Sequence, residues 1–419
     1  MKPEFVDIVM INMSRYSDWQ AGVENRNFHV LHTLLNDPVV RKVVAVDYPP
    51  FSWRRALKQW WQDVVVGQVG GRVMSRSWGD RMVAVRESEI EKTGYSLSGF
   101  SSSDITFKLF VYSSVFNIWS EKLFLKRLNK QLDRLSLKNV VLWSYTPTLT
   151  SVFGQLKESC SVFDAVDNWL EHSAYRNLVN KLKVNYQIIR YKADLIFTTS
   201  PALVEFFDRA RGCRFVPNGV NLEHLNKPAK LVGRDILDLP KPIIGYVGVI
   251  QEDRIDISLI EQLAKDQPNR SFVFIGPVWS SLKQVIKDRL LVLPNIYFLG
   301  YKSSQELPAY LKQFDVAIIP HLVNDFTRST NPMKVYEYLA VGKPVVATPA
   351  AGLELFSQEV YLAATPADFG AAINKALLEN SPAEVSRRQA VVADHTWRKR
   401  VEVMLADIIN YLSAEVLNG

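Results

Sequence analysis

The sequence predicts an α/β protein with two doubly wound, Rossmann-like domains that face each other across a cleft. Its 419 residues exceed what one hydrophobic core usually holds. In both halves, short apolar runs alternate with helical patterns, as in parallel βαβ units. The turn-rich segment Phe215–Gly219 separates the halves. We therefore expect one domain over residues 1–218, a second over 219–395 and a C-terminal helix over 396–419.

The second half has the clearer pattern. Its expected strands are nearly continuous apolar runs, which is typical of parallel strands with both faces covered. They span Ile243–Gly248, Ser271–Gly276, Asn295–Gly300, Asp315–Pro320, Pro344–Thr348 and Val360–Ala363. Helices are expected over 304–313, 367–379, 382–393 and 396–413. Ser303 and Glu306 form a capping-box pattern at the start of the first of these helices.

The first half is also expected to be doubly wound. Its expected strands are Val6–Asn12, Val43–Asp47, Val140–Trp143, Ser161–Asp164 and Leu195–Thr198. Helices are expected near 27–35, 105–135, 148–157, 174–191 and 201–209, with strands or a hairpin within 60–100. The two domains are expected to hinge near 217–228.

Composition indicates a folded protein and excludes several classes. The chain is 47% hydrophobic and 22% charged, with no internal repeat. Cys160 and Cys213 are too few for a disulfide framework and lack metal-ligand spacing, which is typical of a reducing compartment. Residues 1–14 predict a first strand rather than a signal peptide, and the most apolar stretch, Phe107–Trp119, is too short to span a bilayer. We expect a cytoplasmic protein.

The formal net charge of +7 is concentrated in residues 1–218. Residues 51–61 and 121–135 place arginines and lysines among Trp, Phe and Leu. This composition suits contact with an anionic membrane surface. It suits equally well a helix that packs on the core and exposes a basic face. No pattern indicates nucleic acid as a partner.

The segment Ser329–Thr348 carries the most chemical information. Asn331 is expected to be a helix N-cap, Pro332 to open the first turn, and Gly342 to follow the last turn. Such a helix would begin at the carboxyl end of a strand, where open α/β sheets bind ligands and helix amides bind anions. Lys334 lies in its first turn, where the helix dipole disfavours a cation unless an anion is bound.

Lys334 and the first helix amides therefore predict a diphosphate site. Glu337, three residues later on about the same face, is placed to accept hydrogen bonds from ribose hydroxyls. A solvated lysine and an ordinary surface glutamate explain these two residues equally well.

Residues at the ends of the other strands extend this prediction. Gly248 would let backbone amides approach a phosphate. Arg254 is the nearest further cation for the phosphates, unless Asp253 or Asp256 pairs with it. The ends of the next two strands are expected to border a nucleobase or to form ordinary turns: Gly276, Gly300 and Tyr301.

The sequence has no Asp-x-Asp pair, no His/Cys cluster, and no Walker or GxGxxG loop. Neither a metal ion nor a nicotinamide cofactor is expected, so protein cations must neutralise the phosphates.

Several segments together resemble bacterial glycosyltransferases of the GT-B fold, close to glycosyltransferase family 4 and its teichuronic-acid-type branch. The resemblance covers most of the chain. It is carried by NPMKVYEYLAVGKPVVAT, PIIGYVGVI, NIYFLGYKSSQELPAYLKQFDVAIIP, ADLIFTTSPALVEFF with RFVPNGVN, and VFDAVDNW. It implies transfer of a sugar, with retention and without metal or other cofactor, from a nucleotide-sugar to a cell-surface glycan or lipid-linked acceptor.

The resemblance also implies site residues. It places Glu337 on the donor ribose, Lys334 and the Gly248 loop on the diphosphate, and Thr330 and Asn331 near the transferred sugar or phosphate. It makes residues 1–218 the acceptor-binding domain and 219–395 the donor-binding domain, with the C-terminal helix crossing back to the first. The residues expected where the acceptor enters are Trp19, Asn25, Arg26, Tyr145 and Asp167.

The chain departs from the family pattern at Ser329, where members typically carry a glutamate eight residues before the ribose glutamate. The usual Arg/Lys pair after the first strand of the second domain is reduced to Arg254. The residues expected to substitute in contacts to the donor sugar are Asn331, His321 and Asn324.

Two other functions keep the same nucleotide site. A GT-B-fold nucleotide-sugar 2-epimerase would need acid and base carboxyl groups crowded around the sugar. A non-catalytic sugar-nucleotide-binding protein is conceivable because of Ser329.

Overall fold

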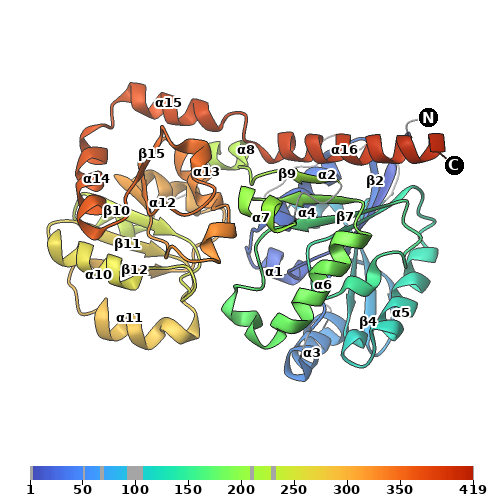
Figure 1. Ribbon diagram of the computed structural model, residues 1–419. Helices are drawn as coiled ribbons and strands as arrows, with labels where there is room; N and C mark the ends of the chain where they lie inside the picture. Colours follow the sequence, from blue (N-terminus) through green and yellow to red (C-terminus); the bar gives the residue numbers. More distant parts are fainter. Residues whose placement is uncertain are drawn as a thin grey trace.

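The computed structural model describes residues 3–50, 52–66, 70–91, 107–207, 212–227 and 233–418. Parts of the predicted segments lie outside the described residues, among them 92–100, 105–106, 208–209 and 228–232. Figure 1 shows two α/β units beside each other, with the last helix of the chain lying along the first unit.

The described strands of the first domain form one sheet in the order β3-β4-β5-β2-β1-β6-β7-β8-β9. Their bounds are β1 (Val6–Ile11), β2 (Val40–Val46), β3 (Gly71–Arg76), β4 (Asp80–Val85), β5 (Leu109–Ser114), β6 (Val140–Ser144), β7 (Cys160–Ala165), β8 (Leu195–Thr198) and β9 (Cys213–Phe215). β4 runs antiparallel to both of its neighbours, β3 and β5, so β3 and β4 make the hairpin expected within 60–100. Residues along β1 are buried on both faces, and alternate residues enter two separate cores.

Helical segments cover both faces of this sheet (Figure 1). They are α1 (Tyr16–Gln20), α2 (Arg26–Asn36), α3 (Trp53–Gln59), the π-helical η1 (Trp60–Val66), α4 (Glu87–Glu91), η2 (Phe116–Ile118), α5 (Glu121–Asp133), η3 (Thr150–Val152), η4 (Ser173–Leu178), α6 (Val179–Lys192) and α7 (Pro201–Phe206). Ser120 caps α5, because its side chain accepts a hydrogen bond from the Leu123 N–H.

Two predicted helices of the first domain are confirmed only in part, the first of them over α5 (Glu121–Asp133). Within 105–135, Leu109–Ser114 is instead the strand β5, whose six residues are all buried between β2 and β4. An apolar run that is buried on both faces shows no periodicity that distinguishes a strand from a helix. Only its short length and its aromatic residues indicate a strand. Within 148–157 only the single turn η3 is helical.

The second domain contains a parallel sheet in the order β12-β11-β10-β13-β14-β15. Its strands are β10 (Ile243–Val247), β11 (Ser271–Ile275), β12 (Ile296–Gly300), β13 (Val316–Ile319), β14 (Val345–Ala347) and β15 (Val360–Leu362). This is the strand order of a dinucleotide-binding fold, in which ligands bind where the order reverses, here between β10 and β13. The predicted fold class, with two Rossmann-like domains, is confirmed.

The helical segments of the second domain are α8 (Leu222–Asn226), α9 (Arg234–Leu237), α10 (Ile257–Asp266), η5 (Ser280–Leu282), α11 (Lys283–Arg289), α12 (Leu307–Gln313), η6 (Thr327–Ser329), α13 (Met333–Ala340), η7 (Glu354–Phe356), α14 (Pro366–Leu378) and α15 (Pro382–Val392). Ser303 and Glu306 do bond to each other, but in a turn just before α12. None of the helices in the described residues is long and apolar enough to cross a bilayer.

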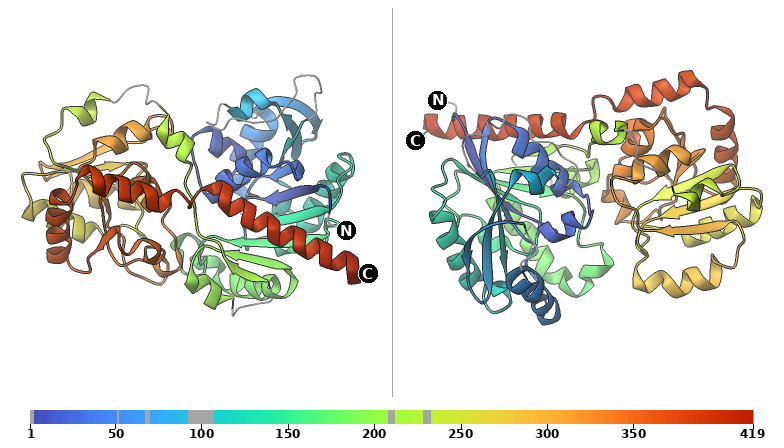
Figure 2. Two further views of the ribbon diagram at one scale, coloured as in Figure 1. Left: turned by 90° about the horizontal axis from the view of Figure 1, so that it is seen from above. Right: turned by 180° about the vertical axis from the view of Figure 1, so that it is seen from behind.

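The last helix, α16 (Trp397–Asn418), returns to the first domain (Figure 2). Its buried side chains, among them Val401, Met404 and Ile408, belong to the same core as β1 and α2. At its start the Trp397 ring stacks on His29 of α2, with ring centroids 4.9 Å apart. The chain therefore crosses between the domains twice, at residues 216–221 and at 395–397.

We expect Met404→Ala to lower the free energy of unfolding by about 2–5 kcal/mol, because the side chain is fully buried under α16. Urea unfolding of the purified chain measures this. Glu402→Ala is the matched control on the exposed face of the same helix, and it should change stability by less than about 1 kcal/mol. Equal effects of the two substitutions would mean that α16 is not part of the first core.

Two carboxyl groups are buried beneath η1. Asp47 accepts hydrogen bonds from Tyr16 N at 2.7 Å and Ser113 Oγ at 2.6 Å, and Asp63 pairs with Arg15 at 3.4 Å. Burial raises the pKa of Asp47 to about 8, with the Asp63 charge adding to it, and burial raises the pKa of Asp63 to about 6. Because the native pKa lies above the unfolded value of about 3.9, the native state holds these protons more tightly.

The stability contributed by the Asp47 proton is therefore complete only below the unfolded pKa of about 3.9, and it is lost progressively as the pH rises to about 8. We therefore expect the stability of Asp47→Asn, which stays neutral, relative to the parent to be higher at pH 9 than at pH 5. Urea unfolding at both pH values tests this. A variant whose stability falls between pH 5 and 9 as steeply as the parent's would contradict it.

Candidate active site

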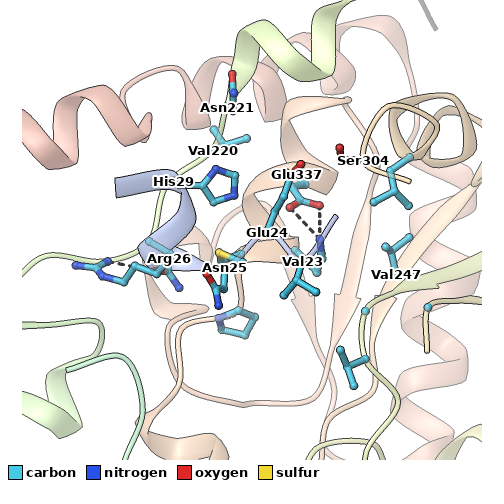
Figure 3. Close-up of a pocket in the computed structure, with 18 of the residues that line it drawn as sticks. Val23, Glu24, Asn25, Arg26, His29, Val220, Asn221, Val247, Ser304 and Glu337 are labelled. Atoms are coloured by element: carbon cyan, nitrogen blue, oxygen red, sulfur yellow. Dashed lines mark hydrogen bonds and ion pairs between the residues drawn. The ribbon is translucent and has the colours of Figure 1, made fainter. Parts of the chain in front are cut away.

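A cavity of about 430 Å³ lies between the two domains. This volume is typical of small-molecule sites. Loop 22–26, His29 and Asp167 line it from the first domain, and residues 218–221 line it from the hinge. The second domain contributes the ends of β10 and β11 and the first turn of α13 (Figure 3).

The first turn of α13 faces this cavity. Thr330 through Lys334 all line it. Pro332 has no N–H, and among the described residues the N–H groups of Met333 and Lys334 have no recorded partner. Free amides at a helix start attract anions, because they are unpaired donors at the positive end of the helix dipole.

Lys334 and Glu337 form an ion pair on the cavity side of α13. The Lys334 ammonium lies 2.9 and 2.8 Å from the two carboxylate oxygens, and both side chains are partly exposed (Figure 3). Without a bound anion, the glutamate thus compensates the lysine that the helix dipole disfavours. The pair can reopen at low cost, because exposed ion pairs contribute about 1 kcal/mol or less.

Two glycines bring the loops after β10 and β11 together beside this helix. Gly248 and Gly276 both have positive φ, 155° and 137°. A Cβ on Gly276 would lie 2.1 Å from the Gly248 carbonyl oxygen, so no side chain fits there. Both glycines line the cavity, whereas Gly300 does not.

Arg254 also lines the cavity, and neither predicted partner takes its charge. Asp253 instead accepts hydrogen bonds from the N–H and hydroxyl of Ser173, and Asp256 caps α10. The Arg254 guanidinium lies 5.6 Å from the Phe326 ring centroid, and its buried Nε has no partner in the described structure. It helps to hold down the pKa of Asp167, which burial raises.

Asn331 connects the domains instead of capping α13. Its Oδ1 accepts hydrogen bonds from Asn218 N at 2.9 Å and from the Tyr336 hydroxyl at 3.0 Å, and Pro332 takes the N-cap position. The predicted cap is therefore wrong, because the buried hinge amide competes for the same oxygen. Gly342 follows the helix with a φ of 76°, as predicted.

Arg26 lies on the other side of the hinge. Its Nε is 2.9 Å from Asp164 Oδ1, and both side chains are fully buried. Its Nη1 also donates to the Pro217 carbonyl and to Asn218 Oδ1, at 3.2 Å each. These contacts make Arg26 a part of the hinge. Its Nη2 is a buried donor that has no partner among the residues that the structure describes.

The remaining expected residues divide between the cavity and the core. Asp167, Tyr301, His321 and Thr330 line the cavity, as does Asn25, which caps α2. Burial lowers the pKa of His321 far below its usual value, so its ring is neutral. Trp19 and Tyr145 are buried in the first core and do not line the cavity. Asn324 caps the turn at Thr327 and does not line the cavity.

Ser329 joins the domains. Its hydroxyl accepts a hydrogen bond from Asn168 N at 3.2 Å, and its carbonyl accepts one from Ser200 Oγ at 2.9 Å. At this position the chain uses a small buried side chain for contact with the first domain.

The sequence did not indicate Glu24, His29 or His224, which also line the cavity. Burial raises the pKa of Glu24, and its carboxyl is close enough to Lys334 and Glu337 to interact with both charges. Glu24 follows a loop held to the second domain by the Tyr301 hydroxyl, which donates to Ala21 O at 2.7 Å. The only signal in the sequence was an acidic residue in the loop after the first strand.

Comparisons with known proteins show which sequences and structures this chain is similar to. Residues 241–379 match the family model described as glycosyl transferases group 1. The chain is 26% identical over 287 residues to TuaH of Bacillus subtilis, a relative named for a glycosyltransferase of teichuronic acid biosynthesis, with 63% of this chain and 72% of TuaH covered.

Solved structures share the fold over nearly the whole chain. HepE of Anabaena, determined with UDP, has a TM-score of 0.63 at 13% identity, covering 96% of this chain and all of HepE. An E. coli trehalose-6-phosphate structure with UDP-2-fluoro glucose has a TM-score of 0.64 at 11% identity, covering 96% and 99%. This chain is a glycosyltransferase of the GT-B type.

For this glycosyltransferase, Asn331 is a test of what the hinge contributes. We expect Asn331→Ala to lower the free energy of unfolding by about 1–3 kcal/mol, because it leaves the buried Asn218 N–H and Tyr336 hydroxyl without their acceptor. Urea unfolding measures it, with Tyr336→Phe as the control that removes one hydroxyl only. If Asn331→Ala abolished transfer at unchanged stability, Asn331 would contact the substrate directly.

Proposed function

We propose that this glycosyltransferase moves a sugar from a nucleotide-sugar donor, held by the second domain, to a hydroxyl of a cell-surface glycan or lipid-linked acceptor. The observation that carries the proposal is the start of α13, where two free amides and Lys334 face a cavity shared by both domains. The relative named for teichuronic acid biosynthesis supports a cell-surface acceptor.

On donor binding, the Lys334–Glu337 pair exchanges its partners. The diphosphate takes the Lys334 ammonium and the free amides of α13, and Glu337 then accepts hydrogen bonds from the ribose. Gly248 and Gly276 line the same cavity, and because they carry no side chain they present only backbone to a diphosphate there. The UDP and UDP-sugar in the structures of similar fold make UDP-sugars the first donors to test.

Catalysis consists mainly in stabilising the departing diphosphate. Negative charge collects on it as the glycosidic bond breaks, and the helix amides and Lys334 are oriented before that charge appears. Arg254, with its free Nε, supplies a further cation. We propose that these groups act without a metal ion and that the anomeric configuration is retained.

A second candidate function is epimerisation of the nucleotide-sugar at C2. It is favoured by one observation, since the carboxyl groups of Glu24 and Asp167 line the same cavity and could exchange protons with a sugar. The family match to glycosyl transferases favours transfer. Proton NMR of a UDP-N-acetylhexosamine incubated with the protein in D₂O separates the two, because only epimerisation introduces deuterium at C2.

We expect Lys334→Ala to slow turnover of the donor by about 10²–10³-fold, the usual cost of losing one preorganised charge contact to a leaving group. Stability should change by about 1 kcal/mol or less, because the ion pair is partly exposed. Release of nucleoside diphosphate from a panel of UDP-, GDP-, ADP- and dTDP-sugars measures turnover.

The matched control is Lys375→Ala, which removes a helical lysine paired with Glu379 on α14, outside the cavity. Its turnover should equal that of the parent. Parent-like turnover in Lys334→Ala would remove this lysine from the mechanism.

A further inference from the structure

The first domain exposes large apolar side chains that its core does not use. They are Trp53, Leu57, Trp61, Trp78 and Trp119, and each is between 47% and 66% exposed. We call these five residues the tryptophan surface. Of the two basic, aromatic segments in the sequence, only 51–61 contributes to it. The segment 121–135 folds into α5, whose Phe124, Leu128 and Leu132 pack on the core.

The five residues form one surface although they come from three parts of the chain. The Trp119 ring lies 4.7 Å from that of Trp53 and 5.2 Å from that of Trp78, measured between centroids. Trp53, Leu57 and Trp61 follow at four-residue spacing along α3 and η1, which places them on about one face. The Trp60 indole N–H donates to the Trp78 carbonyl and fixes η1 against the β3–β4 turn.

Positive charge surrounds this surface. Arg54, Arg55, Lys58 and Arg76 are exposed next to its members. The acidic residues of the same elements are buried and turned inward, where Asp63 pairs with Arg15 and Asp80 pairs with Arg127. Exposed tryptophans among cations are the pattern of proteins that lie at the headgroup level of an anionic bilayer.

The tryptophan surface lies at the same edge of the sheet as the active-site cavity. α3 follows the carboxyl end of β2, and Trp119 follows that of β5, as loop 22–26 and Asp167 follow β1 and β7. Arg15 connects the two places, because it donates to Gln62 of η1 at 3.1 Å and lies two residues from Met13 in the cavity wall. In Figure 1 and the right view of Figure 2, α3 lies at the opposite end of the domain from α16.

We propose that the tryptophan surface docks the first domain on an anionic lipid bilayer, next to the mouth of the cavity. The tryptophans and Leu57 enter the headgroup region, and the surrounding cations bind lipid phosphates. A second copy of the chain fits less well, because two such faces would bring like charges together. The inference rests on the proposed function in one respect, which is that a bilayer at this surface would hold a lipid-linked acceptor beside the active site.

Vesicle sedimentation with the purified full chain tests this. Vesicles of phosphatidylglycerol mixed with phosphatidylcholine should retain the protein at low salt, and pure phosphatidylcholine should retain it weakly. High salt should release it, because cation–lipid attraction is screened. Trp53→Ser with Trp61→Ser should weaken binding by about tenfold or more. Arg54→Gln with Lys58→Gln should weaken it about fivefold for each charge removed.

Matched controls come from the second domain. Leu378→Ser removes a side chain that is 87% exposed, and Lys283→Gln with Lys287→Gln removes two exposed helical charges. These variants should bind vesicles like the parent. All variants are first compared by thermal unfolding, so that a loss of binding is scored only in folded protein.

Failure to bind anionic vesicles, or equal binding by parent and tryptophan variants, would overturn the inference. So would a shift from dimer to monomer in the tryptophan variants by sedimentation velocity, since it would assign the surface to a second copy. Binding of UDP, measured by calorimetry without vesicles, keeps the two proposals apart. A chain that binds UDP and not vesicles defeats only the docking inference, and the reverse result defeats only the proposed function.

Discussion

The arrangement of this molecule depends on one constraint, which is that the positive start of α13 must face the first domain across a narrow gap. A few buried contacts at the hinge impose it. Asn331 accepts from Asn218, Arg26 pairs with Asp164, and Arg26 also donates to the hinge backbone at Pro217. Trp397 and α16 close the connection from the other end of the chain. Because these groups are buried, misplacing one leaves others unsatisfied, which favours a single relative placement of the domains.

The same constraint explains which polar and charged groups meet in the largely apolar wall of the cavity. Each domain contributes the carboxyl ends of its parallel strands, where loops and helix starts carry free amides. Lys334 and Glu337 satisfy each other across a partly exposed pair, and Arg254 keeps a free Nε. Such groups are costly without a ligand and favourable with an anion, so the site is prepared for a negatively charged donor before it binds.

The sequence predicted the architecture well because parallel strands that are buried on both faces leave apolar runs of recognisable length. The prediction from sequence failed where one sequence pattern is compatible with two structures. Leu109–Ser114 was assigned to a helix, although tertiary burial makes it a strand. Asn331 was assigned as an N-cap from its type and position, whereas a hinge amide distant in the sequence takes its oxygen. Trp19 and Tyr145 follow strands in the sequence, as residues of a site would, but burial of their side chains in the core depends on tertiary contacts. Glu24 was missed because only the closed arrangement of two domains brings it to Lys334.

The most direct measurement is a crystal structure of the chain with UDP bound. We expect diphosphate oxygens to accept hydrogen bonds from the N–H groups of Met333 and Lys334. The Lys334 ammonium should leave Glu337 for the phosphate, while Glu337 contacts the ribose. A nucleotide bound elsewhere, or a diphosphate held away from α13 with the Lys334–Glu337 pair intact, would contradict the proposed role of α13.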